Sequence, residues 1–357
     1  MRGYLQPMQT TGSTSQLNLC GLSPLELADV LESAGENRFR ASQIFQWVHQ
    51  KQVFDFSAMS NLSRDLRDTL ARHFQVLELV PVRHAVSRVS ACEKFLFRLH
   101  DGEHIESVWM DFGDRQTVCV SSQVGCALGC KFCATATMGL KRHLDVSEIL
   151  QQILYIQSLP GKKVRNVVFM GMGEPLHNYE TVCKAVRLLN DPAGLAIGQR
   201  RITVSTSGLV PRILQLAEED VPCRLAVSLN AITDEKRNAL MPVNRKHDLD
   251  QLFAACKVWT EKKRDRVTFE YILMDGVNDA EEDLKGLRSR LSRLPCKLNL
   301  IYYNPTNRGF TSSDTRIYER FFEGLKNAPF AVTLRQNMGT DISAACGQLL
   351  VEEAQAG

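Results

Sequence analysis

The chain has 357 residues, of which 44% are hydrophobic and 23% charged, a balance typical of a globular protein large enough to bury a full core. Its net charge of +3 does not by itself indicate a nucleic-acid partner, and the basic clusters at 162–165, 200–201, 245–247 and 262–266 fit either a phosphate-facing surface or solvated loops. Eleven cysteines without a secretion signal, and no apolar run near the ~18 residues of a membrane span, exclude secreted and membrane classes. We expect a cytoplasmic protein with no membrane partner.

The first part of the chain predicts a tail followed by a small helical module. Residues 1–16 are rich in Ser, Thr, Gln and Gly, which is typical of a disordered tail. Ser23 begins a helix-capping pattern, Ser-Pro-Leu-Glu. Two further helices are predicted at 39–48 and 62–74, where apolar residues recur at helical spacing. We predict an accessory module at residues 17–76. From the pattern alone, a packing role and a nucleic-acid-binding role remain open.

Residues 77–114 predict a short antiparallel β extension that also links the module to the rest of the chain. Two alternating segments flank Asp101-Gly102, which is a strong hairpin signal. Glu106 lies in the second segment among apolar neighbours. By its pattern alone, Glu106 is an ordinary solvent-facing carboxylate of a strand.

From residue 115 onwards, apolar strands alternate with helical segments. Six such βα units imply a parallel sheet covered by helices and closed as a full or partial barrel. In that architecture the loops after the strands hold the active site. Strands are predicted at 117–121, 166–170, 202–206, 224–229, 267–273 and 297–303, and helices at 146–158, 179–189, 211–217, 249–262 and 280–291.

Three cysteines follow the first of these strands in the pattern C-x3-C-x2-C: Cys126, Cys130 and Cys133. A closed zinc site or cubane cluster needs four protein ligands, so a triple leaves one position for another group. The sequence has no second C-x2-C pair of the kind that completes a structural zinc site. Three alternatives stay open: buried thiols clustered by chance, a redox iron–sulfur protein with a fourth cysteine ligand, and a zinc-bearing RNA-binding module.

Polar residues stand at the ends of four further predicted strands. Each cluster alone is more typical of a helix cap, but four at corresponding strand ends indicate one ligand-binding face. The glycines of the motif GMGEP, at residues 171–175, let a ligand approach the backbone closely. The carboxylate of Glu174 in this motif can pair with an ammonium group of a ligand. The residues are Gly173 and Glu174 after the second strand, Ser205 in the third, Ser228, Leu229 and Asn230 at the fourth, and Asn304 after the sixth.

These motifs, in this order, resemble the RNA adenine methyltransferases of the RlmN/Cfr family within the radical S-adenosylmethionine (SAM) superfamily. The resemblance runs from about residue 17 to 350 and rests on FRASQIFQW, SSQVGCALGCKFC, GMGEPLHNY, RRITVSTSG, YNP and DISAACGQL. It implies an α/β fold: a partial (βα)6 barrel of the radical SAM type at 115–350 with a C-terminal catalytic cysteine segment, then a tail at 351–357. The resemblance also implies that the helical module at 17–76 is an RNA-binding accessory module.

The resemblance also implies the cofactors. Cys126, Cys130 and Cys133 would hold a [4Fe–4S] cluster whose free iron binds the amino and carboxylate groups of SAM, and two SAM molecules are used per turnover. The pocket for SAM would be lined by Gly173, Glu174, Ser205, Ser228, Leu229, Asn230 and Asn304.

Three further residues acquire catalytic roles only through the resemblance. Cys346 would be methylated by one SAM, and a 5′-deoxyadenosyl radical from a second SAM would take a hydrogen from that methyl group. The methylene radical would then add to an adenine carbon. Cys119 would release the product by forming a disulfide with Cys346, and Glu106 would take the proton from the adenine carbon. Without the resemblance, Cys119 and Cys346 are buried structural thiols.

The implied substrate is an adenine of 23S rRNA, with a tRNA adenine beside the anticodon as a second target and a flavodoxin or ferredoxin as electron donor. Nothing in the sequence demands more than a monomer. Asn230 replaces the family's usual His and cannot carry a proton. Residues 134–142 are closer to the Cfr branch, whereas Pro175 is closer to the RlmN branch. We therefore expect methylation at C2, with C8 as the alternative.

Overall fold

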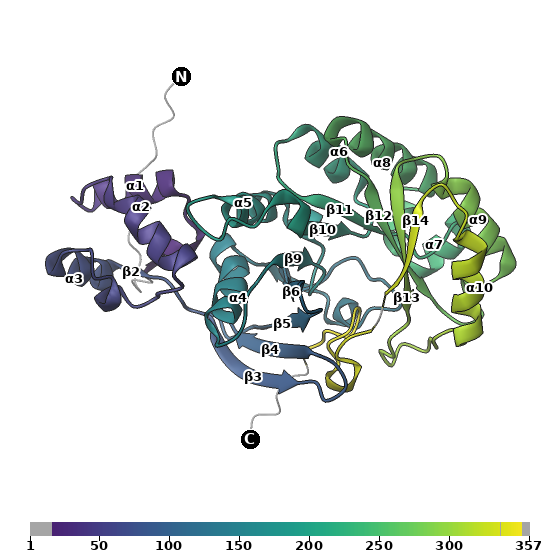
Figure 1. Cartoon of the computed structure of the whole chain (residues 1–357), viewed down its shortest axis with the longest axis horizontal. Coiled ribbons are helices and arrows are strands. Elements are labelled where there is room, and N and C mark those ends of the chain that lie inside the picture. The colour runs from purple at the N-terminus through teal and green to yellow at the C-terminus, as the bar shows by residue number, and fades with distance from the viewer. Residues whose placement is uncertain (1–15, 336, 352–357) are drawn as a thin grey trace.

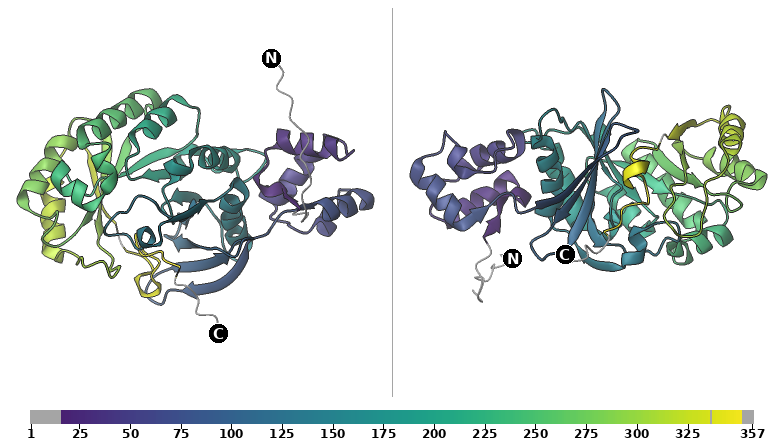
Figure 2. Two further views of the ribbon diagram at one scale, coloured as in Figure 1. Left: turned by 180° about the vertical axis from the view of Figure 1, so that it is seen from behind. Right: turned by 90° about the horizontal axis from the view of Figure 1, so that it is seen from below.

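The computed structural model describes residues 16–335 and 337–351. In chain order these form an N-terminal group of helices, an antiparallel β extension and a large α/β unit (Figure 1). The helical group lies at one end of the long axis, as the views from behind and from below also show (Figure 2). The predicted tails, at 1–16 and 351–357, fall outside the described residues except for one residue of each. No helix in the described ranges is both long and apolar enough to cross a membrane.

A single ten-stranded sheet runs through the β extension and the α/β unit, in the order β14-β13-β12-β11-β10-β9-β6-β5-β4-β3. The strands from β6 to β14 are parallel, whereas β3 to β6 pair antiparallel. β14 and β3 are the two edges, so the barrel is partial. The bounds are β3 (Val80–Val86), β4 (Cys92–Arg98), β5 (His104–Asp111), β6 (Gln116–Cys119), β9 (Asn166–Phe169), β10 (Ile202–Thr206), β11 (Arg224–Ser228), β12 (Val267–Leu273), β13 (Cys296–Tyr302) and β14 (Ala331–Arg335).

The six predicted barrel strands are confirmed, and the structure adds β14 as a seventh parallel strand. The five predicted helices are confirmed as well, and two more follow β11 and β13. The second of these, α10, places Tyr318, Phe321 and Leu325 at helical spacing against the sheet. The helices are α4 (Val146–Ser158), α5 (Tyr179–Asn190), α6 (Val210–Glu218), α7 (Asp234–Leu240), α8 (Leu249–Lys263), α9 (Glu281–Leu291) and α10 (Thr315–Leu325).

The N-terminal helices begin with the predicted cap at Ser23. The Ser23 hydroxyl accepts from the N–H of Glu26, whose carboxylate accepts from the N–H of Ser23 at 2.8 Å, so two free donors are satisfied together. Strand β1 (Leu17–Asn18) pairs in parallel with β2 (Phe74–Gln75) and so joins the two ends of this group. Its helices are α1 (Pro24–Ser33), α2 (Arg40–Phe45) and α3 (Arg64–His73).

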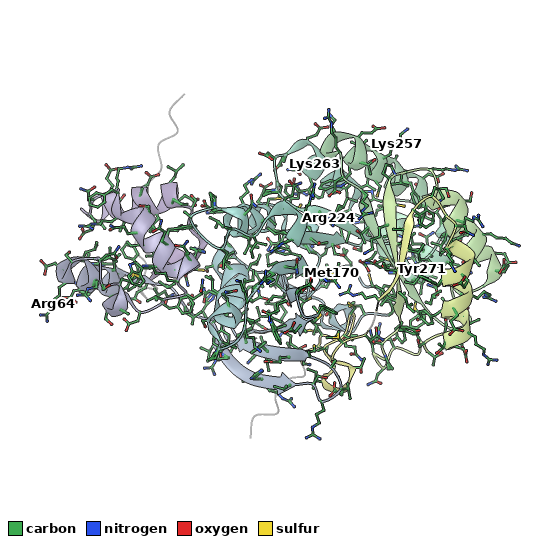
Figure 3. The ribbon with its side chains drawn as sticks, in the orientation of Figure 1. Arg64, Met170, Arg224, Lys257, Lys263 and Tyr271 are labelled. Carbon is green, nitrogen blue, oxygen red and sulfur yellow. The ribbon has the colours of Figure 1, made fainter. Side chains whose placement is uncertain are left out.

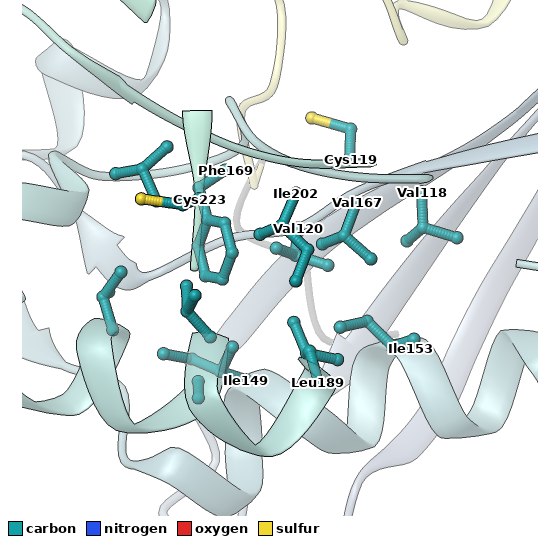
Figure 4. Packing of buried hydrophobic residues seen from close by; sticks show 14 of the residues in the cluster. Val118, Cys119, Val120, Ile149, Ile153, Val167, Phe169, Leu189, Ile202 and Cys223 are labelled. Carbon is teal, nitrogen blue, oxygen red and sulfur yellow. The ribbon is translucent and has the colours of Figure 1, made fainter. Parts of the chain in front are cut away.

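The main hydrophobic core lies between the sheet and the covering helices. Val118 and Val120 point toward Ile149 and Ile153 of α4, whereas Cys119 points away to the opposite side of the strand (Figure 4). This alternation is the period of two of a β-strand. It directs Cys119 to the inside of the barrel, where Cys119 and Met170 line the same cavity, while Lys257 projects from the outer surface (Figure 3).

Candidate active site

A cavity at the carboxyl ends of the parallel strands, called the main cavity below because most of the predicted site residues line it, encloses ≈ 870 Å³ of empty space, including its opening to solvent. This is the position at which barrels of this type bind their ligands. Nine of the thirteen predicted site residues line it: Cys126, Cys130, Cys133, Gly173, Glu174, Ser205, Ser228, Asn230 and Cys346.

The cysteine loop is framed by a small hairpin of β7 (Gln123–Gly125) and β8 (Leu140–His143). Gly125 adopts φ +75°, and a Cβ there would lie 1.8 Å from the carbonyl oxygen of Gly139, so only glycine allows the two backbones to approach this closely. The N–H of Cys126 donates to that same carbonyl at 2.7 Å. These constraints bend residues 126–139 back on themselves and present the three thiols to one cavity.

Burial opposes ionisation of these thiols. It is the main cause that raises the pKa of Cys126 to about 12, and it raises the pKa of Cys130 well above the ordinary range, with added effects of Cys133 and Cys126. Thiolates so placed are stabilised only when a cationic group binds them. Three neighbouring thiols of this kind are the chemistry of a metal-cluster site.

The donor set fits a cluster better than a single ion. The described residues contain no group of three or more His, Cys, Asp or Glu side chains placed so that they could hold a single metal ion. In a [4Fe–4S] cluster each thiolate binds a different iron, so the ligands need not converge on one point. Three cysteines facing a shared cavity match such a cluster with one iron left for a non-protein ligand.

The segment after β9 lies against the cysteine hairpin. Gly173 has φ +98°, and a Cβ there would meet the side chain of Gln123 at 2.5 Å. The same Gln123 accepts a hydrogen bond from the N–H of Glu174 at 2.7 Å. The glycine therefore brings this loop into direct contact with the strand that leads into the cysteines.

Glu174 is buried, and its carboxylate binds neighbouring loops. Oε2 accepts from the N–H and the hydroxyl of Ser207 at 2.8 and 2.7 Å, and Oε1 accepts from the N–H of Leu176 at 3.2 Å. Burial raises the pKa of the carboxyl group, and the bonds from Ser207 oppose that shift. A carboxylate has about four acceptor positions, so Glu174 keeps capacity for a ligand ammonium in the cavity.

Asn230 adopts the left-handed backbone conformation, with φ +53°. Its Oδ1 accepts from the N–H of Ile272 at 2.9 Å, which fixes the turn after β11 to the neighbouring strand. Asparagine tolerates this conformation better than most residues, which gives a structural reason for Asn here. Leu229 lies outside the cavity, because its side chain is fully buried in the hydrophobic core.

The C-terminal segment carries Cys346 back to the cysteine loop. The N–H of Ala134 donates to the carbonyl of Gly347 at 2.8 Å, and the hydroxyl of Thr135 donates to Leu349 at 2.6 Å. Asn304 does not line the main cavity, but its Nδ2 donates to the carbonyl of Cys346 at 3.2 Å while its buried Oδ1 has no partner. Asn304 therefore positions the Cys346 backbone and retains an acceptor for a ligand.

A second cavity adjoins the first, and both Cys119 and Cys346 line it. The Cys119 thiol is buried, which is the main cause that raises its pKa to about 12, and the nearby Cys346 adds to the shift. The two thiols, 227 positions apart in the sequence (346 minus 119), thus face the same space.

The solvent-facing interpretation of Glu106 is wrong. Its side chain is buried at 4% exposure because β4 and the C-terminal segment cover it. Oε1 forms an ion pair with Lys94 at 2.8 Å, and Oε2 accepts from the N–H of Leu350 at 3.1 Å. Burial raises the pKa of Glu106, and the Lys94 charge opposes this rise. Glu106 lines a third, more polar cavity together with Lys94.

Arg335 and Glu270 line the main cavity as well, although neither was predicted as a site residue. Arg335 ends β14 and lines both the main and the second cavity, with Nη1 3.8 Å from Oε2 of Glu270. The charge of Cys346 is the main cause that raises the pKa of Arg335. An ionisable residue within a predicted strand was the available signal for Glu270, whereas β14, which carries Arg335, was not predicted.

Comparison with known proteins agrees with this geometry. The Radical SAM superfamily matches residues 120–287, and the ribosomal RNA large subunit methyltransferase N-terminal domain matches residues 17–76. A probable dual-specificity RNA methyltransferase RlmN from Alkaliphilus oremlandii is 43% identical over 94% of this chain and 97% of its own length. The corresponding protein of Symbiobacterium thermophilum is 47% identical over 93% of this chain and 90% of its own.

A solved structure extends the similarity to three dimensions. The crystal structure of a radical SAM methyltransferase from Sphaerobacter thermophilus superposes with a TM-score of 0.91 and 44% identity, covering 94% of this chain and 100% of that one. The relatives and the solved structure cover nearly the whole chain, and both family matches lie within that range. The chain therefore belongs to the RlmN family of radical SAM methyltransferases.

Proposed function

We propose that this protein methylates carbon 2 of an adenine in 23S rRNA, and of a tRNA adenine beside the anticodon, by radical SAM chemistry. The observation that carries the proposal is that relatives named as dual-specificity RNA methyltransferases align with nearly the whole chain. The matched N-terminal family is that of a ribosomal RNA methyltransferase. Regiochemistry at C2 follows the RlmN assignment.

The chemical problem explains the need for a cofactor of this class. Carbon 2 of adenine is a poor nucleophile, so direct transfer of a methyl cation from a sulfonium would be very slow. Radical addition avoids that barrier, and cofactors supply such chemistry. In this proposal Cys126, Cys130 and Cys133 hold a [4Fe–4S] cluster, which when bound supplies the electron for reductive cleavage of SAM. The predicted pocket residues that line the main cavity, including Glu174 and Asn230, bind SAM beside it.

Cys346 carries the methyl group in this scheme. Its place between the two cavities supports the role, since one thiol must meet SAM in the main cavity and Cys119 in the second. Arg335, which lines both, supplies a positive charge beside the Cys346 sulfur. In the release step a bond forms between the sulfurs of Cys119 and Cys346, and the bond from the Cys346 sulfur to the transferred carbon breaks. That carbon takes the electron pair of the broken bond and the proton given up by the Cys119 thiol, and so becomes the methyl group.

Glu106 is the proposed proton acceptor at the adenine carbon. Its buried carboxylate with a raised pKa is suited to holding a proton, and Lys94 is in place to stabilise the charged form. The target base must leave its stack to reach such an enclosed site. We further propose that the unit at 17–76 is an RNA-binding accessory module, that a flavodoxin or ferredoxin donates the electrons, and that the protein acts as a monomer.

Mass spectrometry of nucleosides from reacted RNA tests the proposal. We expect 2-methyladenosine from both 23S rRNA and tRNA substrates, and 8-methyladenosine as the only product would overturn the C2 assignment. Anaerobic purification provides an independent check of the enzyme class. A brown protein that cleaves SAM upon reduction is expected, whereas a colourless protein containing zinc would favour the non-catalytic RNA-binding alternative.

A further inference from the structure

Arg237 on α7 is a fully buried cation directly behind the main cavity. Its guanidinium donates four hydrogen bonds. Nη2 donates to the carbonyls of Ser207 at 2.6 Å and Ser228 at 3.0 Å, Nε donates to the carbonyl of Leu229 at 3.1 Å, and Nη1 donates to Oδ1 of Asn244 at 2.9 Å. All four acceptors are neutral groups, so the hydrogen bonds are satisfied but the charge is not paired.

An unpaired buried charge is costly, and a fold that retains one needs a compensating group. Burial is the main cause that lowers the pKa of Arg237 to about 10, and among the groups that oppose this shift Cys130 comes first, ahead of Asp234. Asp234 instead accepts hydrogen bonds from Asn244 and Leu249, so its carboxylate is committed elsewhere. This order agrees with a compensating group at the cysteine loop, which contacts α7 directly through Lys131 and Leu240.

Backbone contacts join that loop to the helix of Arg237. The N–H of Lys131 donates to the carbonyl of Leu240 at 2.9 Å, and the carbonyl belongs to the last residue of α7. A Cβ on Gly129 would contact Pro242, just beyond that helix, at 3.8 Å. The cysteine loop and α7 are thus one packed unit, independent of any charge argument.

The same guanidinium ties together two loops that shape the cavity. Its acceptors Ser207 and Ser228 follow or end β10 and β11, and Ser207 also holds the carboxylate of Glu174. Gly208 has φ +110°, and a Cβ there would lie 3.2 Å from Nη2 of Arg237. Glycine at this position lets the guanidinium reach both loops. One side chain thereby fixes three adjacent strand ends.

We propose that Arg237 is a positioning residue for the cofactor site, which fixes the loops after β10 and β11 and stabilises with its buried positive charge the reduced cluster held at Cys130. The inference rests on the proposed cluster ligands and assigns a role to a residue outside that ligand set. A cluster with three thiolate ligands becomes more negative when it takes an electron. A buried cation nearby raises its reduction potential, because net charge is one of the factors that set this potential.

Three variants separate charge from geometry. Arg237→Gln removes the charge, Arg237→Lys keeps the charge but loses the planar fork, and Lys236→Gln removes a neighbouring positive charge on α7 that faces Asp283 instead of the cavity. Each protein is reconstituted anaerobically with iron and sulfide. Iron content, the thermal unfolding midpoint, SAM affinity and the cluster reduction potential are then measured, the last by redox titration monitored by electron paramagnetic resonance.

We expect Arg237→Gln to shift the reduction potential to more negative values, and Arg237→Lys and Lys236→Gln to keep the potential of the unmodified protein. SAM affinity should fall about tenfold in Arg237→Gln, and by a smaller factor in Arg237→Lys, because loss of one or more hydrogen bonds disturbs the loops. Lys236→Gln should bind SAM normally. If Arg237→Gln does not fold, a changed potential in Arg237→Lys overturns the electrostatic role.

Failure of the inference can be told apart from failure of the proposed function. An unmodified protein that binds no iron overturns the cluster ligands and with them the electrostatic role of Arg237. An unmodified protein with an intact cluster, together with an Arg237→Gln variant of unchanged potential, overturns the electrostatic role alone. Unchanged SAM affinity in both Arg237 variants overturns the positioning role.

Discussion

The Glu174 carboxylate and Ser207 form a double hydrogen bond, with the Ser207 N–H and hydroxyl 2.8 and 2.7 Å from the same Glu174 oxygen. The two residues belong to loops after neighbouring strands β9 and β10, so the pair fastens one ligand-binding loop to the next. Charge-assisted bonds of this kind are the stronger ones in proteins. The cofactor pocket is therefore largely shaped before any ligand enters.

Gly173→Ala should disturb this preformed pocket. The residue has φ +98° and its added Cβ would lie 2.5 Å from Gln123, so both backbone strain and a clash oppose alanine. We expect a loss of about 2–4 kcal/mol in the free energy of unfolding and weaker SAM binding. Gly161→Ala is the matched control: its φ is +77° but no atom lies within 4 Å of the new Cβ, so only about 1–2 kcal/mol should be lost. Equal losses in the two variants would contradict the clash.

Cys119→Ala should trap the reaction before product release. Without the second thiol no disulfide can form with Cys346, so a covalent adduct between protein and RNA is expected to accumulate at Cys346. Denaturing gels and mass spectrometry of the crosslinked peptide detect it. Cys183→Ala removes a buried thiol of α5 and should release RNA normally. Isolation of Cys119→Ala free of crosslinked RNA under turnover conditions would count against disulfide release.

Single alanine substitutions at Cys126, Cys130 and Cys133 should each abolish cluster binding. Loss of one of three thiolates leaves two irons without protein ligands, so iron and sulfide content should fall from about four per chain to nearly zero after anaerobic reconstitution. The absorbance of the cluster should disappear with it. Cys183→Ala serves again as the control and should retain the full cluster. Retention of the cluster in any of the three variants would remove that residue from the ligand set.

Glu106→Gln should separate SAM cleavage from base methylation. Glu106 lines the third cavity and not the main one, so 5′-deoxyadenosine should still form, while methylated adenine should decrease by roughly 10²–10⁴-fold, the usual effect of a general base. Glu103→Gln, which only loses its surface pair with Lys141, should leave methylation unchanged. A parallel loss of both products in Glu106→Gln would indicate a structural role instead.

The reactivity of Cys119 should depend steeply on pH. Burial, aided by Cys346, raises its pKa to about 12 from the ordinary thiol value near 8.5, so the folded protein keeps the thiol protonated at neutral pH. Below that pKa the thiolate fraction rises about tenfold per pH unit, and alkylation should rise equally between pH 7 and 10. Peptide mapping after iodoacetamide treatment measures this. A plateau near pH 8.5 would contradict the raised pKa.

The raised pKa of Cys119 also makes the folding stability decrease as pH rises. Above the unfolded thiol's value the unfolded chain loses a proton that the folded Cys119 retains, so the contribution of this residue to folding stability falls as pH increases from about 8.5 toward 12. Cys119→Ala should therefore show a shallower loss of stability over that range, measured by denaturant unfolding at several pH values. An identical slope in both proteins would contradict it.

The barrel could be predicted because its strands are nearly uninterrupted apolar runs between amphipathic helices, and this pattern is local. Strand β14 was missed since Ala331–Arg335 is largely exposed and mixes polar with apolar residues, as an edge strand does. The C-x3-C-x2-C spacing identified the cysteine loop for the same reason: its information lies within eight positions.

Residues whose role depends on distant partners could not be predicted in this way. Glu106 is buried only because Lys94 and Leu350, the latter 244 positions away, meet its two oxygens. Arg237 resembles any helical arginine until the carbonyls of two separate loops surround it. Whether a charged side chain is buried depends on segments that are distant in the sequence, so it cannot be predicted from the sequence of one helix.

The proposed catalytic groups differ in how freely they can move, because two of them lie on paired strands and one does not. Glu106 on β5 and Cys119 on β6 belong to adjacent strands of one continuous ladder, in which Val108 stands opposite Cys119. Cys346 lies instead on a segment without strand pairing. Amides of β5 and β6 should exchange their hydrogens only in rare global openings, and those around Cys346 in frequent local ones. In the proposed scheme the base and the releasing thiol stand on paired strands of the sheet, whereas the methyl-bearing thiol is held only by single hydrogen bonds such as that from Asn304, so it is the group that can shift between its successive reactants.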